Sequence, residues 1–250
     1  MSGHSKWATI KHKKGALDAK RGKLFTKLIK EITVAARMGG GDPAGNPRLR
    51  KAISDAKGQA MPGDTIKRAA QRGTGELEGA SYEEITYEGT GPGGTLFLVE
   101  SMTDNKNRTV AEIRKIFEKN NGAMGAAGTA AWAFERKGLI SVGKEATEDQ
   151  LMELAVGAGA EDYSDGGDEW HITTPPDGLN VVLDALEKGG VKVKTSSLAH
   201  VPKMKKPLAG RDAQVALNLA EALDDHDDVQ NVYADFDISD EELAALEGAG

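Results

Sequence analysis

Charge is divided sharply along this 250-residue chain. The first 75 residues hold 17 Lys and Arg against 5 Asp and Glu, whereas the rest of the chain holds 15 against 34. A chain with a formal net charge of −7 therefore begins with a strongly basic segment. This asymmetry is typical of a polyanion-binding module joined to an acidic body.

Composition narrows the classes of site that the chain can build. There is no cysteine, which excludes disulfides, zinc–thiolate centres and cysteine nucleophiles. Aromatic residues make up only 5% of the chain, so platforms for stacking bases should be few. The N-terminus lacks the apolar core of a signal peptide, and no apolar run approaches the roughly 18 residues of a membrane span. We expect a cytoplasmic protein.

The basic segment is predicted to be an arm followed by three helices. Residues 1–15 form the arm, in which Trp7 either pins the arm to the body or, as the alternative, stacks on a base. The first helix is expected over residues 16–38. The second helix begins after Asn46 as N-cap, and the third follows the turn at residues 61–64 and ends at Gly73.

Periodicity gives the first helix two unlike faces. Leu24, Leu28 and Ile32 share an apolar arc with Phe25, Ile29, Ala35 and Ala36. The opposite arc, expected to face solvent, carries Lys20, Lys23, Lys27, Lys30 and Arg37.

The remainder alternates strands and helices. Strands are predicted at residues 82–87, 95–102 and 131–134, with a helix that opens at Asn107 or Thr109. Residues 139–195 then show the order βαββαβ of a split-βαβ sandwich.

A helix at residues 211–223 and a strand at 231–238 would complete the earlier sheet, which predicts a discontinuous middle domain. The fold class is therefore α+β, with an N-terminal three-helix domain plus two α/β sandwich (ferredoxin-like) domains. Predicted boundaries are 1–78 for the basic arm and helices, 79–136 plus 206–240 for the middle domain, 137–205 for the inserted domain and 241–250 for an acidic tail.

Glycine-rich and acidic stretches offer little support for catalysis. Residues 89–94 lack the Gly-Lys-Ser/Thr ending of a phosphate loop and precede a strand, so a hairpin turn is expected. Residues 122–128 are either a ligand-contacting loop or a small-residue connector. Residues 224–228, Asp-Asp-His-Asp-Asp, lack the pattern of a calcium loop and are interpreted as a solvated turn.

No catalytic residue, metal site or cofactor is predicted, and the chain is expected not to be an enzyme. A nucleotide hydrolase depending on Asp104 or Glu100 remains one alternative. A protein–protein adaptor, in which the basic segment only aids solubility, is another.

The basic segment is expected to bind the sugar–phosphate backbone of a nucleic acid. No helix presents an evident set of base-reading side chains, which favours backbone or shape recognition. The predicted contacts are Lys6, Trp7, Lys11, His12, Lys13, Lys14, Lys20, Arg21, Lys23, Lys27, Lys30, Arg48, Arg50, Lys51, Lys67, Arg68 and Arg72. A possible contact loop, for which helix capping is the simpler explanation, comprises Asp104, Asn105, Lys106, Asn107 and Arg108.

Several motifs together resemble the YebC family, which includes PmpR-type bacterial regulators and the mitochondrial translational activator of cytochrome oxidase. The similarity covers nearly the whole chain. The motifs are Gly3-His-Ser-Lys-Trp7, Lys20-Arg-Gly-Lys-Leu-Phe-Thr-Lys-Leu28, Asn46-Pro-Arg-Leu49, Met61-Pro-Gly-Asp-Thr-Ile66, Tyr87-Glu-Gly-Thr-Gly-Pro-Gly-Gly94, Thr103-Asp-Asn-Lys-Asn-Arg108 and Tyr233-Ala-Asp-Phe236.

The resemblance implies three domains, with the basic helical domain first, and a non-enzymatic regulator of gene expression. It implies either a DNA-binding transcriptional regulator or a ribosome-associated translation factor that relieves stalling on proline-rich stretches. Promoter DNA and ribosomal RNA are thus both candidate partners, and no membrane partner is expected.

Overall fold

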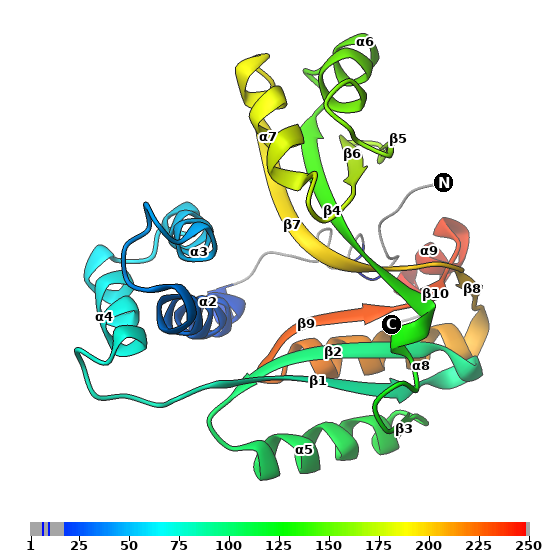
Figure 1. Cartoon of the computed structure of the whole chain (residues 1–250). Helices are drawn as coiled ribbons and strands as arrows, with labels where there is room; N and C mark the ends of the chain where they lie inside the picture. The colour runs from blue at the N-terminus through cyan, green and yellow to red at the C-terminus, as the bar shows by residue number, and fades with distance from the viewer. Residues whose placement is uncertain (1–6, 8–9, 11–17, 249–250) are drawn as a thin grey trace. The chain divides into compact units, whose positions relative to one another are not determined.

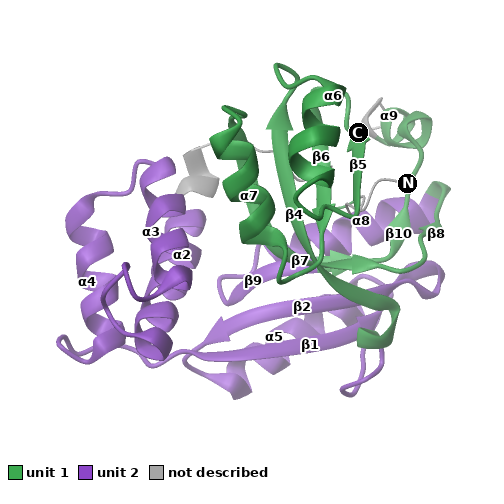
Figure 2. Cartoon of the chain, turned by 45° about the horizontal axis from the view of Figure 1, so that its top comes forward, with its two compact units in different colours: residues 1–13, 130–210, 233–250 green, residues 14–129, 211–232 purple. Residues whose placement is uncertain are grey.

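The computed structural model describes Trp7, Ile10 and residues 18–248. The chain divides into two compact units (Figure 2), each built from segments that are far apart in the sequence. One unit comprises Met1–Lys13, Ala130–Gly210 and Tyr233–Gly250, and the other comprises Lys14–Thr129 and Arg211–Val232. The division into three domains with the predicted boundaries stays a prediction.

The second unit begins with three helices, α2 (Asp18–Gly39), α3 (Pro47–Gly58) and α4 (Gly63–Thr74). The cap predicted for α3 is present, because the side chain of Asn46 accepts a hydrogen bond from the Leu49 amide at 3.1 Å. The buried core between the helices comprises Ile32, Ala35, Ala36, Leu49, Ala52, Ala56, Met61, Ile66 and Ala69. The predicted helical arrangement of the basic segment is therefore confirmed.

A four-stranded sheet completes this unit, in the order β3 (Ala123–Met124), β1 (Glu83–Thr90), β2 (Leu96–Thr103) and β9 (Val229–Ala234), as Figure 1 shows. The helices α5 (Lys106–Lys119) and α8 (Gly210–Asp224) pack on it. The rings of Phe97 on β2 and Phe117 on α5 meet edge to face at 6.0 Å between centroids.

The third strand of this sheet differs from the expectation. Residues 131–133 form a short 3₁₀ turn instead of a strand, and the edge position is taken by β3 inside the predicted glycine loop. A two-residue strand has no detectable periodicity, which is why the pattern of apolar residues did not indicate it.

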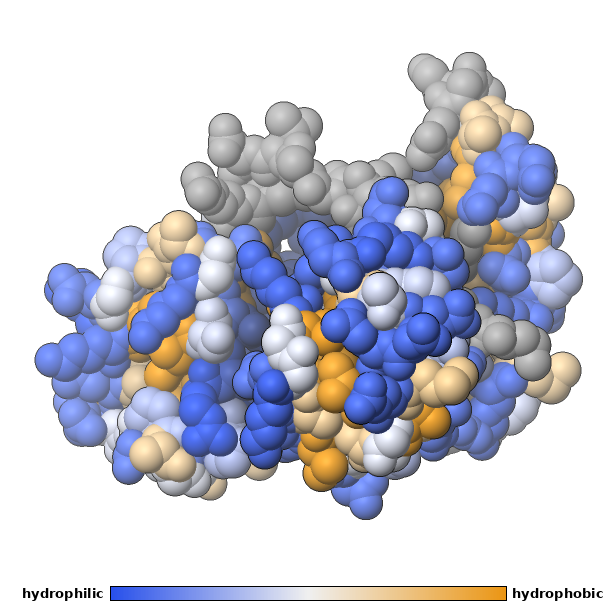
Figure 3. Space-filling view, turned by 90° about the horizontal axis from the view of Figure 1, so that it is seen from above, coloured by the Kyte–Doolittle hydropathy of each residue, from blue (hydrophilic) through white to orange (hydrophobic). Residues whose placement is uncertain are grey.

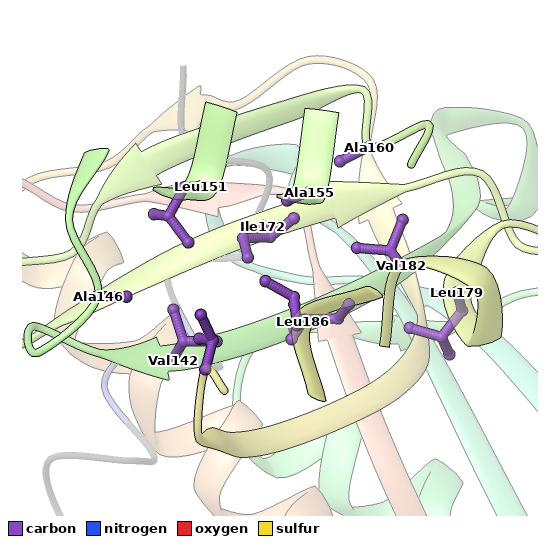
Figure 4. Close-up of a cluster of buried hydrophobic side chains, with 11 residues drawn as sticks. Val142, Ala146, Leu151, Ala155, Ala160, Ile172, Leu179, Val182 and Leu186 are labelled. Atoms are coloured by element: carbon purple, nitrogen blue, oxygen red, sulfur yellow. The ribbon is translucent and has the colours of Figure 1, made fainter. Parts of the chain in front are cut away.

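The first unit contains an antiparallel sheet in the order β5 (Asp162–Asp165), β6 (Glu169–Thr174), β4 (Phe134–Gly143) and β7 (Val193–Pro202). The helix α6 (Glu148–Leu151), extended by a π-helical turn at Met152–Val156, lies between β4 and β5 in the sequence, and α7 (Leu179–Lys188) lies between β6 and β7. This is the predicted ferredoxin-like order. Figure 4 shows Leu151 and Ala155 from the first helix and Val182 and Leu186 from the second, pointing toward Val142 and Ile172 of the sheet.

Two features of this unit extend beyond the predicted elements. The strand β4 runs unbroken from Phe134 into the segment expected to begin at Leu139, and β7 continues to Pro202. The acidic tail forms a helix, α9 (Asp240–Gly248), after the short parallel pair β8 (Lys206–Pro207) and β10 (Phe236–Asp237). None of the described helices is both long and apolar enough to span a lipid bilayer.

Candidate nucleic-acid interface

Three lysines of α2 face a cluster of aspartates from the opposite end of the chain. Lys23, Lys27 and Lys30 are spaced by four and three residues, so they share one face of the helix, which we call the lysine face. The ammonium of Lys27 donates to the Asp224 carbonyl at 2.9 Å and to its carboxylate at 3.2 Å. Lys23 donates to the Asp225 carbonyl at 3.0 Å, and its Nζ lies 3.5 Å from that carboxylate.

Lys30 is buried within this contact. Its residue surface is 5% exposed and that of Asp228 is 4% exposed, and the Nζ–Oδ1 distance is 2.6 Å. The ammonium also donates to the carbonyls of Asp227 at 2.8 Å and Met102 at 3.2 Å. The expectation that Lys30 faces solvent was wrong, because three acceptors surround its ammonium inside the protein.

The second carboxylate oxygen of Asp228 receives three further donors. Thr109 donates at 2.6 Å, Arg108 at 2.7 Å and Thr103 at 3.2 Å. Burial alone would raise the pKa of Asp228, but the hydrogen bonds from Lys30, Thr109 and Arg108 outweigh it and hold the pKa well below its usual value. Residues 224–228 are therefore not a merely solvated turn but the carboxylate partner of the lysine face; we call them the acidic turn.

The predicted contact loop lies beside the acidic turn. Its Asn105 is the N-cap of α5 and accepts a hydrogen bond from the Arg108 amide at 3.1 Å. The prediction that the helix opens at Asn107 or Thr109 was therefore wrong. Asp104 pairs with Arg108 at 3.1 Å, while Lys106 lies 3.6 Å from Glu83 at the surface. Asn107 is exposed. Capping and ion pairing are thus both present in this loop, and its contact with nucleic acid stays a prediction.

A cleft of about 670 Å³ opens between these groups. Its lining combines both signs of charge: Lys23, Lys30, Tyr82, Asp104, Arg108, Glu112, Asp225, His226, Asp227 and Asp228. The His226 ring accepts from the Asp228 amide at Nδ1 and lies 2.9 Å from Glu112 through Nε2, an arrangement that suits the Nε2–H tautomer. Among the described residues, no group of three or more His, Asp or Glu side chains is arranged to hold a metal ion.

Three other predicted cations have local partners. Arg48 bridges Glu31 and Glu84, with nitrogen–oxygen distances of 2.7 Å to each. The hydrogen bonds that Arg48 donates, first to Glu31 and then to Glu84, raise its pKa above the usual value. Lys51 pairs with Asp55 at 2.9 Å, and Arg50 donates to backbone carbonyls at 3.2 and 3.4 Å.

The cations of α4 differ from all of these. Lys67, Arg68 and Arg72 are exposed, and none of the carboxylates whose side chains the structure describes lies within ion-pair distance of them. At 100° per residue they share the outward arc of the helix, opposite the buried Ile66 and Ala69. Lys57 at the end of α3, absent from the predicted contacts, is likewise exposed and has no ion-pair partner among those carboxylates.

Some predicted contacts cannot be placed. Lys6, Lys11, His12, Lys13 and Lys14 lie outside the described residues, as do the side chains of Lys20 and Arg21. Trp7 is described and is 4% exposed, and its contact with nucleic acid stays a prediction.

The partners of the lysine face were missed by sequence reasoning. Lys30 and Asp228 are 198 residues apart, so no local pattern links them. The available signal was complementary charge: a row of lysines on one helix and a run of four aspartates elsewhere.

Comparisons with known proteins agree over nearly the full length. The family model for the TACO1/YebC protein N-terminal domain matches residues 5–76, and the model for the TACO1/YebC second and third domain matches residues 82–236. A probable transcriptional regulatory protein of Geotalea uraniireducens is 56% identical over 97% of this chain and 98% of its own. A protein of the same description from Solibacter usitatus is 57% identical over 98% of this chain and 99% of its own. The crystal structure of a conserved hypothetical protein from Aquifex aeolicus matches with a TM-score of 0.87 and 47% identity, covering 96% of this chain and 99% of that one.

Proposed function

Because the chain belongs to the TACO1/YebC family, we propose that it is a non-enzymatic regulator of gene expression that binds nucleic acid through its basic helical segment. Curated relatives at 56–57% identity are described as probable transcriptional regulatory proteins, which makes promoter DNA the proposed target. Ribosomal RNA is the alternative, because the same cations would neutralise either backbone.

The observation that carries this proposal is the cationic face of α4, which has no ion-pair partner among the described side chains. Lys67, Arg68 and Arg72 extend outward from a helix whose opposite side is packed. Cations held on a folded element without carboxylate partners are free to exchange condensed counterions for phosphates. Lys57 extends the set onto α3.

The lysine face of α2 contributes less directly. Lys27 and Lys30 are occupied by the acidic turn, so a phosphate would have to compete with carboxylates already in place. We therefore assign the first contacts to α4 and the end of α3. Asp104, which a hydrolase would use, is engaged by Arg108 in this arrangement.

The test is charge reversal on α4. Arg68→Glu with Arg72→Glu should weaken binding of duplex DNA at least about tenfold and make the log–log salt slope shallower by about 2. The matched control is Lys188→Glu with Lys192→Glu, two exposed lysines outside the helical segment that give the same change in net charge. Equal affinities for the two variants would contradict the proposal.

Crosslinking in cells, followed by sequencing of the recovered nucleic acid, separates the two targets. Recovery of promoter DNA supports transcriptional regulation. Recovery of ribosomal RNA instead would mean that the same interface binds ribosomal RNA and that the protein is a translation factor.

A further inference from the structure

Trp132 is the one aromatic side chain with a mostly exposed surface among the described residues. It is 66% exposed, whereas every other Phe, Tyr and Trp of the chain is buried or partly buried. Trp7 is 4% exposed, and Trp170 packs under the Lys144 ammonium at 3.6 Å. A large aromatic side chain with most of its surface exposed is a common mark of a binding surface, particularly where aromatic residues are as scarce as here.

The backbone beneath Trp132 is held in place. It lies in the 3₁₀ turn Ala131–Ala133, immediately before β4. The Trp132 carbonyl accepts from the Lys203 ammonium at 2.8 Å, and the Ala133 carbonyl accepts from the Lys203 amide at 2.9 Å. The ring therefore extends from a fixed support rather than from a loose loop.

The segment that anchors this turn is basic. Residues 203–206 read Lys-Met-Lys-Lys, with Lys203 and Lys205 exposed and Met204 81% exposed. The register that pairs Phe134 with Pro202 brings this segment beside Trp132. The nearest exposed acid on β4, Glu135, is paired with Lys137 at 3.4 Å. A local cationic site thus lies within a largely acidic part of the chain.

We propose that Trp132, with Lys203 and Lys205, forms a binding site for single-stranded nucleic acid, in which an unpaired base stacks on the indole and the lysines neutralise the flanking phosphates. This inference rests on the proposed function, to which it adds a second contact outside the basic helices. A single strand is required because base pairs in a duplex leave no face open to the ring, whereas aromatic stacking combined with cations is the usual way to hold unpaired bases. Figure 3 shows hydrophilic and hydrophobic side chains interspersed over the face that it presents.

The experiment uses the full chain and two labelled probes, an oligouridine of about 12 nucleotides and a duplex of equal length. Trp132→Ala should weaken binding of the single strand about 5- to 150-fold and leave duplex binding unchanged. Trp132→Phe should retain most of the affinity, because it keeps an aromatic face. Lys205→Ala should make the single-strand salt slope shallower by about 0.7. Val181→Ala, at a residue that is 58% exposed on α7, is the matched control for the loss of exposed apolar surface.

Single-strand affinity within twofold of wild type in Trp132→Ala would overturn the inference, as would an equal loss on both probes. Ultraviolet crosslinking of oligouridine to the wild-type chain needs no variant: a crosslink at Trp132 supports the site, and crosslinks confined to residues 18–75 contradict it. The proposed function is tested separately by the double variant Arg68→Glu with Arg72→Glu. If this variant bound both probes as tightly as the wild type, the proposed function itself would fail.

Discussion

At the scale of single residues, the pair of Lys30 and Asp228 places two opposite charges in the interior of the fold. Removing two charges from water is costly, and the contact is favourable only because Thr103, Thr109 and Arg108 complete the hydrogen bonding of the carboxylate. Deleting one partner leaves the other charge buried without compensation. This contact should therefore affect stability far more than the exposed pairs beside it.

Asp228→Asn is expected to destabilise the protein by about 3–5 kcal/mol, because Lys30 would remain buried without a counter-charge. Asp225→Asn, which removes a half-exposed partner of Lys23, should cost about 0–1 kcal/mol. Urea unfolding monitored by circular dichroism measures both. Adding Lys30→Met to Asp228→Asn should recover part of the loss; equal effects of the two single variants would contradict the assignment.

The same carboxylate predicts a pH dependence. Its pKa is lower in the folded state than in the unfolded chain, so its contribution is fully present above the unfolded value of about 4 and is lost as pH falls further. The stability gap between wild type and Asp228→Asn should therefore narrow below about pH 4. Denaturant midpoints at neutral and acid pH test this, and a gap that widens on acidification would refute it.

At the scale of elements, the helical segment depends on a close approach of α2 and α4. A Cβ built at Gly73 would lie 2.3 Å from the Thr33 carbonyl oxygen and 2.7 Å from the Ala36 Cβ. Backbone and a short side chain cannot move aside, so the two helices would have to separate. Glycine at this position is required by packing.

Gly73→Ala is accordingly expected to destabilise the protein by about 1–3 kcal/mol through this overpacking. The control is Gly22→Ala, because a Cβ there meets nothing within 4 Å and alanine favours a helix interior by about 0.5–1 kcal/mol. Thermal melting of the two variants should shift in opposite directions. A raised melting temperature for Gly73→Ala would contradict the overpacking, because it would show that α4 can move away from α2 without loss of stability.

Elements with a strong local signal were predictable. The Asn46 cap fixed the start of α3, and the apolar spacing in α7 gave its bounds at Leu179 and Lys188. The strand β3 and the N-cap of α5 were not, because a two-residue strand and neighbouring Asn residues give no decisive pattern. Only part of the candidate site could be predicted from the sequence. The outward placement of the α4 cations followed from helical periodicity, whereas the burial of Lys30 depends on a contact that is distant in the sequence.

At the scale of the whole molecule, the sheet that contains β1 and β2 needs a strand from the far end of the chain. The strand β9 and the helix α8 both follow the ferredoxin-like segment. The N-terminal basic segment and its acidic partner are thus joined only after nearly all of the sequence is present.

A chain that ends at Ala209 should therefore fail to form the β3-β1-β2-β9 sheet, since it lacks α8, the acidic turn and β9. A chain that ends at Ser239 loses only α9 among the described elements and should retain the sheet. Hydrogen exchange at the β1 and β2 amides distinguishes them: strong protection is expected for the longer chain alone. Equal protection in both would show that the sheet tolerates the loss of its edge.

The separation of 198 residues between Lys30 and Asp228 also has a kinetic meaning. Synthesis at 5–20 residues per second produces the lysine face of α2 roughly 10–40 s before the carboxylates that neutralise it. Throughout that interval the nascent chain presents an uncompensated cationic helix to every polyanion in its surroundings. Release from such early encounters would then coincide with docking of the acidic turn, whose carboxylates compete with any polyanion for this helix.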